Sequence, residues 1–256
     1  MPLRVGPTGP HTAPICFIGE APGADEVRQM RPFVGPAGME LTRLLTQAGI
    51  SRSECYLTNV VKERPPGNNI KAFIDLSRRA PVHTKEYDAY ELELYSELEK
   101  LEANVYVPLG NIPLYALTRR KGITKWRGSI LSASVLGKAI KVIPTIHPAA
   151  LLPGRGQYIW RYFVLHDLHR VLLESKSPEV DLPDYELVLR PTFAEAMAYI
   201  DACRDTELVA VDIEVINEEV SCISLSTSSD SSISIPFTED RENYFTEGEE
   251  LAIWRA

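Results

Sequence analysis

A carboxylate and an aromatic ring stand just beyond an apolar run near the amino terminus. Residues 13–18 read APICFI and are followed by Gly-Glu-Ala-Pro-Gly, a pattern typical of a buried strand that ends sharply. Ligands of open α/β sheets bind at the carboxyl ends of the strands, so Glu20 is predicted to place a carboxylate at the mouth of a sheet. Phe33 is predicted either to stack on a flat ligand or to fill the core. The glycines alone are equally typical of an ordinary tight turn.

Four ordered motifs carry a resemblance to a known family. They are GEAPGADE with RPFVGPAG from Gly19, YLTNVVKERPPGNN from Tyr56, PLG at Pro108 and TIHPAALL from Thr145. In order and spacing they resemble the family 4 uracil-DNA glycosylases over the first two thirds of the chain. The resemblance implies a domain that excises uracil from DNA in base excision repair, with single- or double-stranded DNA as its partner.

The resemblance also implies roles for individual residues. Cleavage of the N-glycosidic bond of deoxyuridine leaves positive charge on the sugar and negative charge on the base. Glu20 would stabilise the sugar and position or deprotonate the attacking water, while a neutral His147 would donate to uracil O2. Asn59 would pair with uracil O4 and N3–H, which cytosine cannot match. Taken alone, a His before Pro is more often structural, and an Asn at a strand end is as often a capping residue. The implied base-binding residues are Gly19, Ala21, Phe33 and Asn59.

A base inside a duplex must be flipped out to reach such a site. The segment after His147 is the expected wedge, with Leu151 or Leu152 filling the vacated stack; the alternative is a simple hydrophobic return loop. A loop at residues 24–26 is the candidate for excluding the thymine methyl group. The wedge prediction covers Pro148, Ala149, Leu151 and Leu152. Cations near the motifs are candidates for phosphate contacts, namely Lys62, Arg64, Arg127 and Arg155.

The chain departs from the family at its cysteines. Family 4 members typically hold a 4Fe–4S cluster through four cysteines, two before the first motif and one just before the RPP of the second. Here Glu63 stands in that third place, and no cysteine pair precedes Gly19. We therefore predict no cluster and no cofactor for the glycosylase, with buried, reduced thiols instead. A long Tyr/Leu helix within residues 69–101 is the candidate for replacing the cluster's structural role.

Strands and helices alternate through residues 1–174. This alternation predicts a three-layer α/β domain with a mostly parallel central sheet, in which a late hairpin delivers His147. The predicted helices are residues 36–48, 87–101 and 157–174, and the predicted strands after the first are 55–61, 104–109, 130–135 and 139–146.

Charge divides the chain into two parts. Residues 1–172 carry 22 Lys and Arg against 15 Asp and Glu, whereas residues 173–256 carry 5 against 20. A basic first part suits a polyanionic partner, while the acidic part more plausibly holds cations or lies against a basic surface. Residues 175–186, rich in acids and prolines, are predicted to be a linker.

Residues 187–256 are predicted to be an incomplete α+β segment. Residues 192–195 form a capping box that opens a helix to about residue 204, and short strands follow at 208–213, 220–227 and 231–237. VAVDIE at residues 209–214 resembles the first motif of the ribonuclease H-like 3′-5′ exonucleases attached to family A DNA polymerases. The resemblance implies the amino-terminal portion of a glycosylase–polymerase fusion, of viral type or truncated, with a carboxyl-terminal polymerase domain as a further partner.

Asp212 and Glu214 are two residues apart on one predicted strand face. That spacing suits joint Mg²⁺ coordination in a two-metal nuclease. The chain stops before the further carboxylates of such a site, so we predict metal binding only in a complete domain and no exonuclease activity from this chain. The alternative is an acid pair exposed on an edge strand.

Two classes of function compete. No apolar run reaches membrane-span length and MPLRV lacks a signal-peptide core, so the sequence predicts a cytoplasmic protein, associated with a nucleoid or viral replication and not secreted. It is predicted to be either an active uracil-DNA glycosylase or a catalytically silent uracil- or DNA-binding module that tethers a polymerase to its template. A binding module has no chemical need for Glu20 and His147 together, which favours the enzyme.

Overall fold

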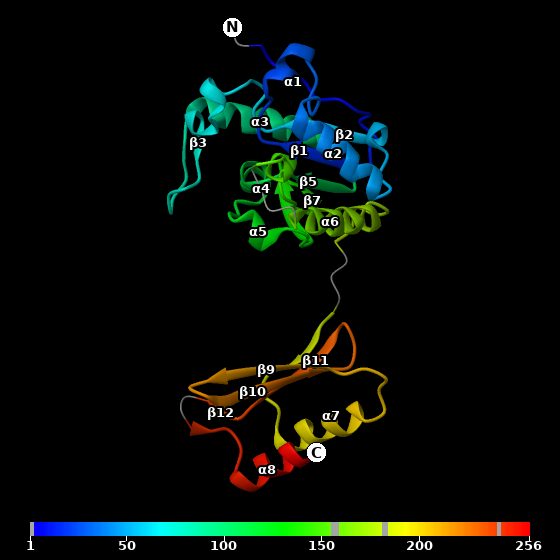
Figure 1. The fold of residues 1–256 in the computed structure, drawn as a ribbon, viewed down its shortest axis with the longest axis vertical. Helices are drawn as coiled ribbons and strands as arrows, with labels where there is room; N and C mark the ends of the chain where they lie inside the picture. The colour runs from blue at the N-terminus through cyan, green and yellow to red at the C-terminus, as the bar shows by residue number, and fades with distance from the viewer. Residues whose placement is uncertain (1–2, 155–158, 181–183, 240–241) are drawn as a thin grey trace. The chain divides into compact units, whose positions relative to one another are not determined.

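The computed structural model describes residues 3–154, 159–180, 184–239 and 242–256. The chain forms two compact units, residues 1–180 and 181–256, which Figure 1 colours from blue to yellow-green and from yellow to red. We describe each unit by itself.

A five-stranded sheet forms the centre of the first unit. Its strand order is β2-β1-β5-β7-β6, and the first four strands are parallel while β6 is antiparallel to β7 at the edge. β1, β2 and β5 are buried along their whole length, which explains their nearly continuous apolar sequences. The strands are β1 (Ile15–Gly19), β2 (Cys55–Asn59), β5 (Val105–Pro108), β6 (Leu131–Val135) and β7 (Lys138–Val142).

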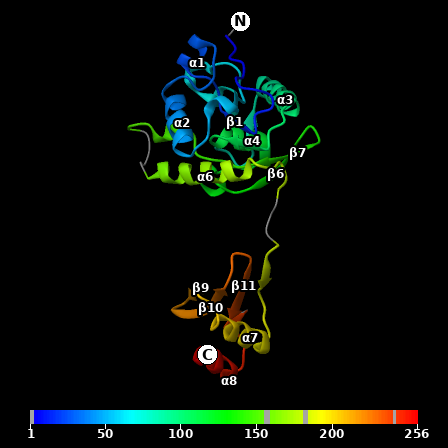
Figure 2. The ribbon, with the colours of Figure 1, turned by 90° about the vertical axis from the view of Figure 1, so that its right-hand side faces the viewer.

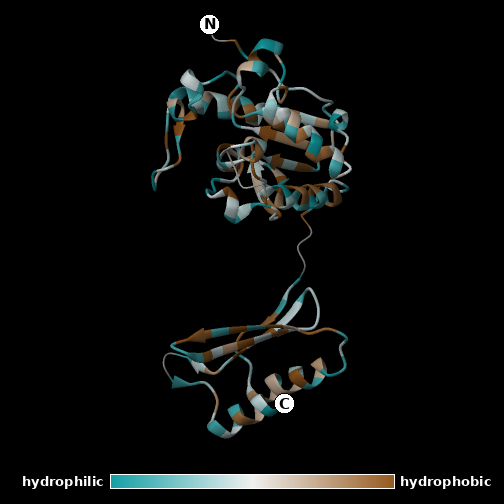
Figure 3. Ribbon diagram, viewed as in Figure 1, coloured by the Kyte–Doolittle hydropathy of each residue, from teal (hydrophilic) through white to brown (hydrophobic). Residues whose placement is uncertain are grey.

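Helices cover both faces of this sheet, because successive side chains of a strand point to opposite sides. Cys16 and Ile18 of β1 pack into the core cluster that includes α3 and α4. Ile15 and Phe17 pack into the cluster that includes α2 and α6. Figure 2 shows α2 and α3 on opposite sides of β1, and Figure 3 shows hydrophobic residues concentrated in the sheet between them. The α/β fold with a mostly parallel central sheet is confirmed.

All three helices predicted for the first unit are present, as α2, α3 and α6, with shifted ends. Gly49 at φ 76° ends the segment after α2, as its position in the sequence indicates. Three helices were not predicted: α1, which replaces the loop predicted at residues 24–26, α4 directly after β5, and the short α5. The helices are α1 (Ala24–Gln29), α2 (Pro36–Gln47), α3 (Lys85–Glu99), α4 (Asn111–Thr118), α5 (Ile123–Trp126) and α6 (Trp160–Glu174).

Short elements connect these helices and strands. A two-stranded ribbon of β3 and β4 precedes α3 and was not predicted. The short elements are the 3-10 helices η1 (Arg52–Glu54), η2 (Pro66–Asn68), η3 (Ile70–Ala72) and η4 (Pro148–Leu151), with β3 (Ile74–Asp75) and β4 (Val82–His83).

The second unit is a four-stranded sheet of order β8-β11-β10-β9 with two helices. The three predicted strands are present and antiparallel, and the predicted capping box of Thr192 and Glu195 opens α7. β8 pairs parallel with β11 and was not predicted. The elements are β8 (Glu186–Val188), α7 (Phe193–Cys203), β9 (Ala210–Ile216), β10 (Glu219–Ser226), β11 (Ser231–Pro236), β12 (Thr238–Glu239), β13 (Glu242–Asn243) and α8 (Glu247–Arg255).

The core of this unit lies between α7, α8 and the inner strands, and β9 stays outside it. Ile233, Ile235 and Phe237 are almost fully buried. By contrast Val211 and Val215 of β9 are 58% and 57% exposed. In the described part of the chain, no helix has the length and apolar character needed to cross a membrane.

Candidate functional site

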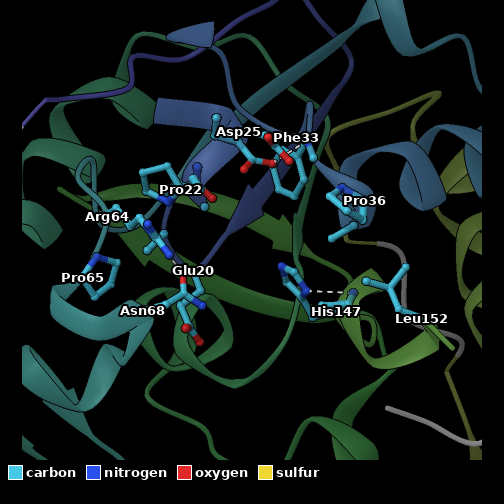
Figure 4. A pocket seen from close by; sticks show the side chains of 18 of the residues that line it. Glu20, Pro22, Asp25, Phe33, Pro36, Arg64, Pro65, Asn68, His147 and Leu152 are labelled. Carbon is cyan, nitrogen blue, oxygen red and sulfur yellow. Dashed lines mark hydrogen bonds between the residues drawn. The ribbon is translucent and has the colours of Figure 1, made fainter. Parts of the chain in front are cut away.

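A cleft of about 770 Å³ opens beyond the carboxyl ends of β1 and β2. It brings together Glu20, Asn59 and His147, which are far apart in the sequence. Figure 4 shows Glu20 and Asn68 on one side of the cleft and His147 with Leu152 on the other. Ala21 and Phe33 also line it, as predicted for base-binding residues. Such a cleft at the strand ends of a parallel sheet is where α/β proteins bind ligands.

Gly19 allows the side chains of the cleft to approach one another. It pairs with Asn59 across the β1–β2 register, and its carbonyl accepts from Val60 N at 2.9 Å. A Cβ at Gly19 would collide with the Asn59 amide oxygen and with the Phe33 ring. Gly19 does not itself line the cleft. Its missing side chain instead leaves room for Asn59 and Phe33.

The backbone of Phe33 lies in the left-handed region, at φ 54°. Such a conformation is unfavourable for a bulky residue and persists only where neighbours hold it. Arg52 does so by donating to Phe33 O at 2.8 Å and to Thr42 Oγ1 at 2.9 Å. The ring centroids of Phe33 and His147 lie 6.5 Å apart. Phe33 is only 6% exposed and belongs to a core cluster, and it also lines the cleft. Core packing is thus present, and stacking on a flat ligand stays a prediction.

Glu26 is a second positioning residue that the sequence analysis missed. Its Oε1 accepts from Gly35 N at 2.9 Å and thereby ties α1 to the segment that follows Phe33. A Cβ at Gly23 would lie 2.7 Å from the other oxygen of this carboxylate, so the loop closes tightly around Glu26. Residues 24–26, predicted as a loop, line the cleft from the first turn of α1.

Glu20 is partly buried where β1 ends. Its carbonyl accepts from Val61 N at 3.0 Å, which extends the β1–β2 pairing by one bond. Burial raises the pKa of its carboxyl group, because the charged form loses solvation. Glu20 also lines a second, smaller cavity of about 330 Å³. Glu20 therefore takes part in the walls of both cavities.

His147 is held in one tautomer. Its Nδ1 accepts from Ala149 N at 3.1 Å, drawn as a dashed line in Figure 4. A neutral imidazole whose Nδ1 accepts must carry its proton on Nε2. Burial lowers the pKa of His147 to about 4, so the ring is neutral at physiological pH. The geometry thus supplies an uncharged N–H donor in the cleft.

A buried network fixes the backbone that leads to His147. Thr145 N donates to Pro108 O at 3.0 Å, and its hydroxyl donates to Asp167 Oδ2 at 2.6 Å. Asp167 is fully buried and also accepts from Arg127 Nε at 3.0 Å. Desolvation raises the pKa of Asp167, although Thr145 and Arg127 oppose that shift.

Two of the cations predicted to contact phosphates are paired with carboxylates inside the unit. Arg127 is paired with Asp167 and donates to Phe163 O at 2.9 Å, so its donors are engaged inside the unit. Lys62 is 2% exposed, and its ammonium donates to Glu97 Oε2 at 2.6 Å. Each of these two cations thus forms an ion pair with a carboxylate that lies far away in the sequence. Arg64 is exposed and lines the cleft, and Arg155 lies outside the described residues.

The predicted wedge divides into two parts. Pro148 is buried, and Leu151 packs against the core cluster beneath α2 and α6. Ala149 and Leu152 line the cleft instead. Of the two leucines left open by the sequence, Leu152 is therefore the one placed to meet a ligand.

The cysteines do not fit an iron–sulfur cluster. Cys16 and Cys55 lie on adjacent strands but pack into the clusters on opposite faces of the sheet. Cys203 and Cys222 belong to the other unit. Burial raises the pKa of the Cys16 thiol, and burial raises the pKa of Cys55 to about 12, which disfavours the thiolates that iron requires.

Polar contacts occupy the region around Glu63, the position where the resemblance places a cysteine. Glu63 forms a backbone bridge with Arg4, which in turn pairs with Glu93 of α3. The Arg4 guanidinium lies 5.5 Å from the centroid of the Tyr90 ring, also on α3. These contacts join the amino-terminal segment to the helix that was predicted to replace the cluster's structural role.

Purified protein is expected to be colourless and to lack stoichiometric iron, because Cys16 and Cys55 cannot reach one cluster. Visible absorbance and a metal assay of protein purified without oxygen would measure this. About four irons per chain, lost in Cys16→Ser, would contradict it.

Asp212 and Glu214 lie on β9, opposite Ser224 and Cys222 of β10. Both are exposed. Within the described ranges, no cluster of three or more His, Cys, Asp or Glu side chains is arranged to hold a metal ion. Their placement on an exposed edge strand agrees with the alternative interpretation that the sequence left open.

The first unit is thus an α/β domain with a ligand cleft at the carboxyl edge of its sheet. Residues 7–164 match the uracil DNA glycosylase superfamily. The match covers most of the chain, which therefore belongs to this superfamily.

The similar proteins include two type-4 uracil-DNA glycosylases. The chain is 40% identical to that of Thermotoga maritima over 158 residues, which are 61% of this chain and 74% of the relative. It is 36% identical to that of Archaeoglobus fulgidus over 149 residues, 56% of this chain and 69% of the relative. It is also 31% identical to a DNA polymerase of Bacillus phage SP01 over 174 residues, 67% of this chain and 17% of that polymerase.

Proposed function

We propose that the chain is a uracil-DNA glycosylase that hydrolyses the N-glycosidic bond of deoxyuridine in DNA. The observation that carries the proposal is the cleft lined by Glu20, Asn59 and a neutral His147 with its proton on Nε2. An anion and a fixed neutral donor are what a reaction needs when it separates positive charge on a sugar from negative charge on a base.

In this proposal water attacks C1′ of the sugar as the C1′–N1 bond breaks. The bonding electron pair leaves with the base, and the resulting charge spreads to uracil O2, where His147 Nε2–H donates. Glu20 orients the water, takes up its proton and stabilises the positive charge on the sugar. No cofactor takes part in these steps.

Asn59 and Phe33 would recognise the flipped base. The Asn59 amide can donate to uracil O4 and accept from N3–H, while the Phe33 ring offers a stacking surface. Residues 24–26 in α1 line the cleft and would meet a methyl group on the base, and Glu26 holds that turn through Gly35. Leu152 would fill the vacated position in the stack, and the exposed Arg64 would contact a phosphate.

The test is incubation of the protein with uracil-containing single-stranded DNA, followed by alkali to cut abasic sites. Cleavage at the uracil position, absent from a thymine control, is the expected result. Tight binding without abasic sites would instead favour the silent uracil- or DNA-binding module that tethers a polymerase to template.

Asn59→Asp is expected to weaken uracil excision by about tenfold or more and to admit cytosine. A carboxylate repels uracil O4 but accepts from cytosine N4–H₂. Single-stranded oligonucleotides with one uracil or one cytosine are the substrates, since they avoid the cost of opening a base pair. Asn69→Asp is the matched control, because Asn69 Oδ1 accepts from Lys71 N at 3.1 Å and a carboxylate can do the same. Uracil excision at the parental rate would reduce Asn59 to a structural residue.

We further propose that residues 1–174 are the glycosylase domain, 175–186 a linker and 187–256 the beginning of a 3′-5′ exonuclease-like domain. The similarity to a phage DNA polymerase supports a polymerase domain as partner, with roles in cytoplasmic DNA repair and replication. Asp212 and Glu214 would then bind Mg²⁺ only in a complete exonuclease domain, since two carboxylates cannot by themselves hold two metal ions.

A further inference from the structure

A short basic projection stands beside the cleft. It comprises residues 70–84, that is η3, β3, the turn and β4, and we name it the basic arm. Figure 1 shows the arm, in cyan, extending from the edge of the first unit next to α3.

The base of the arm is rigidly held. Phe73 and Ile74 are 8% and 1% exposed, and the rings of Phe73 and Tyr90 meet edge to face at 5.6 Å. Thr84 N donates to Phe73 O at 2.9 Å, which closes the ribbon. Buried aromatic and aliphatic anchors of this kind fix the direction in which the arm points.

The tip presents arginines to solvent. The Lys121 ammonium donates to the carbonyls of Arg78 and Arg79 at 2.7 and 3.0 Å. These bonds hold the backbone of the turn, and Arg78 and Arg79 are both exposed.

Positive charge dominates this surface. Residues 64–83 carry four Lys and Arg against one acid. Residues 118–127 carry five Lys and Arg against none; Arg119 and Arg127 are paired with Glu91 and Asp167, which leaves Arg120, Lys121 and Lys125. The single acid, Asp75, faces Lys71 at 4.0 Å and accepts from Ser77 N at 2.9 Å. The Arg120 guanidinium lies 4.1 Å above the Trp126 ring. Such an excess of cations on one surface attracts a polyanion.

Glu20 lines both the cleft and a smaller cavity beside the arm. The smaller cavity, of about 330 Å³, is lined by Ile74 and Asp75 of the arm, by Lys121 and by Glu20 itself. A ligand held at Glu20 would therefore have this charged surface directly beside it.

We propose that the basic arm, with Arg120 and Lys121, binds the phosphates of the DNA strand that flanks the target nucleotide. This deepens the proposed function, since it assigns a surface for the strand next to the excised base. In this proposal Arg78 and Arg79 contact the phosphates of the DNA strand. The buried Phe73 and Ile74 at the base of the arm hold the arm in place beside Glu20.

The test compares Arg78→Ala/Arg79→Ala with the parent in binding to labelled single-stranded DNA over a salt series. Loss of two phosphate contacts should weaken binding by about tenfold at low salt and reduce the slope of log affinity against log salt by about 1.4. Arg43→Ala/Lys100→Ala is the matched control, because it removes two exposed cations that line neither cavity. This control is expected to keep the parental slope.

Uracil-free DNA separates this proposal from the proposed function. The arm contacts phosphates, so the arm variant should lose the same affinity for thymine-containing DNA of the same length, whether or not the parent excises uracil. An unchanged slope, an equal loss in the control variant, or a parent that binds no DNA would overturn the proposal. Equal thermal midpoints of parent and variants show that both remain folded.

Discussion

Replacing His147 with alanine is expected to slow uracil excision by about 10²–10³-fold, the usual effect of losing one donor to a developing anion. Because His147 Nδ1 accepts from Ala149 N, the imidazole proton is on Nε2. Alanine at this position removes that donor. Single-turnover excision from uracil-containing single-stranded DNA is the measurement. His169→Ala, on the exposed side of α6, is the control and should retain the parental rate.

The same variant should change how stability depends on pH. The pKa of His147 falls from 6.5 to about 4 on folding, so below pH 6.5 the unfolded chain binds a proton that the folded chain does not. Folding therefore loses stability as the pH falls from about 6.5 to about 4. His147→Ala removes that loss, and its free energy of unfolding should decline less steeply across this window than that of the parent. Denaturant unfolding at several pH values measures the difference, and identical slopes would contradict the buried, neutral imidazole.

The sheet and the three central site residues were predictable because their signals are local. Strands buried on both faces are apolar throughout, and the motifs place Glu20 and Asn59 directly at strand ends. α1 was missed because its six residues follow a Pro-Gly turn and leave no apolar stripe to detect. Short helices of this kind depend on contacts such as that of Glu26 with Gly35, which no local pattern encodes.

The errors concern charged residues whose partners lie far along the chain. Lys62 lies within one motif and Arg127 between two others, but Glu97 and Asp167 pair with them from α3 and α6. The sequence shows a cation and not its neighbours. Arg52 was overlooked for the same reason, since its role depends on the carbonyl of Phe33, 19 residues away. Which group a charged side chain pairs with is decided only when the chain folds.

Glu20→Gln is expected to reduce excision by at least about 10²-fold while leaving DNA affinity nearly unchanged, because the carboxylate acts on charge that develops only in the transition state. Glutamine keeps the shape and can still hydrogen-bond water, so the loss isolates the negative charge. Competition binding to uracil-containing single-stranded DNA measures affinity, and single-turnover kinetics measure excision. Glu99→Gln, exposed at the end of α3, is the control.

Measuring the excision rate of the parent and of Glu20→Gln over a range of pH tests the role of the carboxylate most directly. Burial raises the pKa of Glu20, so the parent should lose activity with falling pH at a higher pH than an exposed glutamate would. Because glutamine does not titrate, the residual rate of Glu20→Gln should lack this acidic limb. The variant should also be at least as stable as the parent at neutral pH, since burying a neutral amide costs less than burying a charge. A parental rate in Glu20→Gln, or an unchanged acidic limb, would remove Glu20 from the reaction and leave His147 as the only assigned catalytic group.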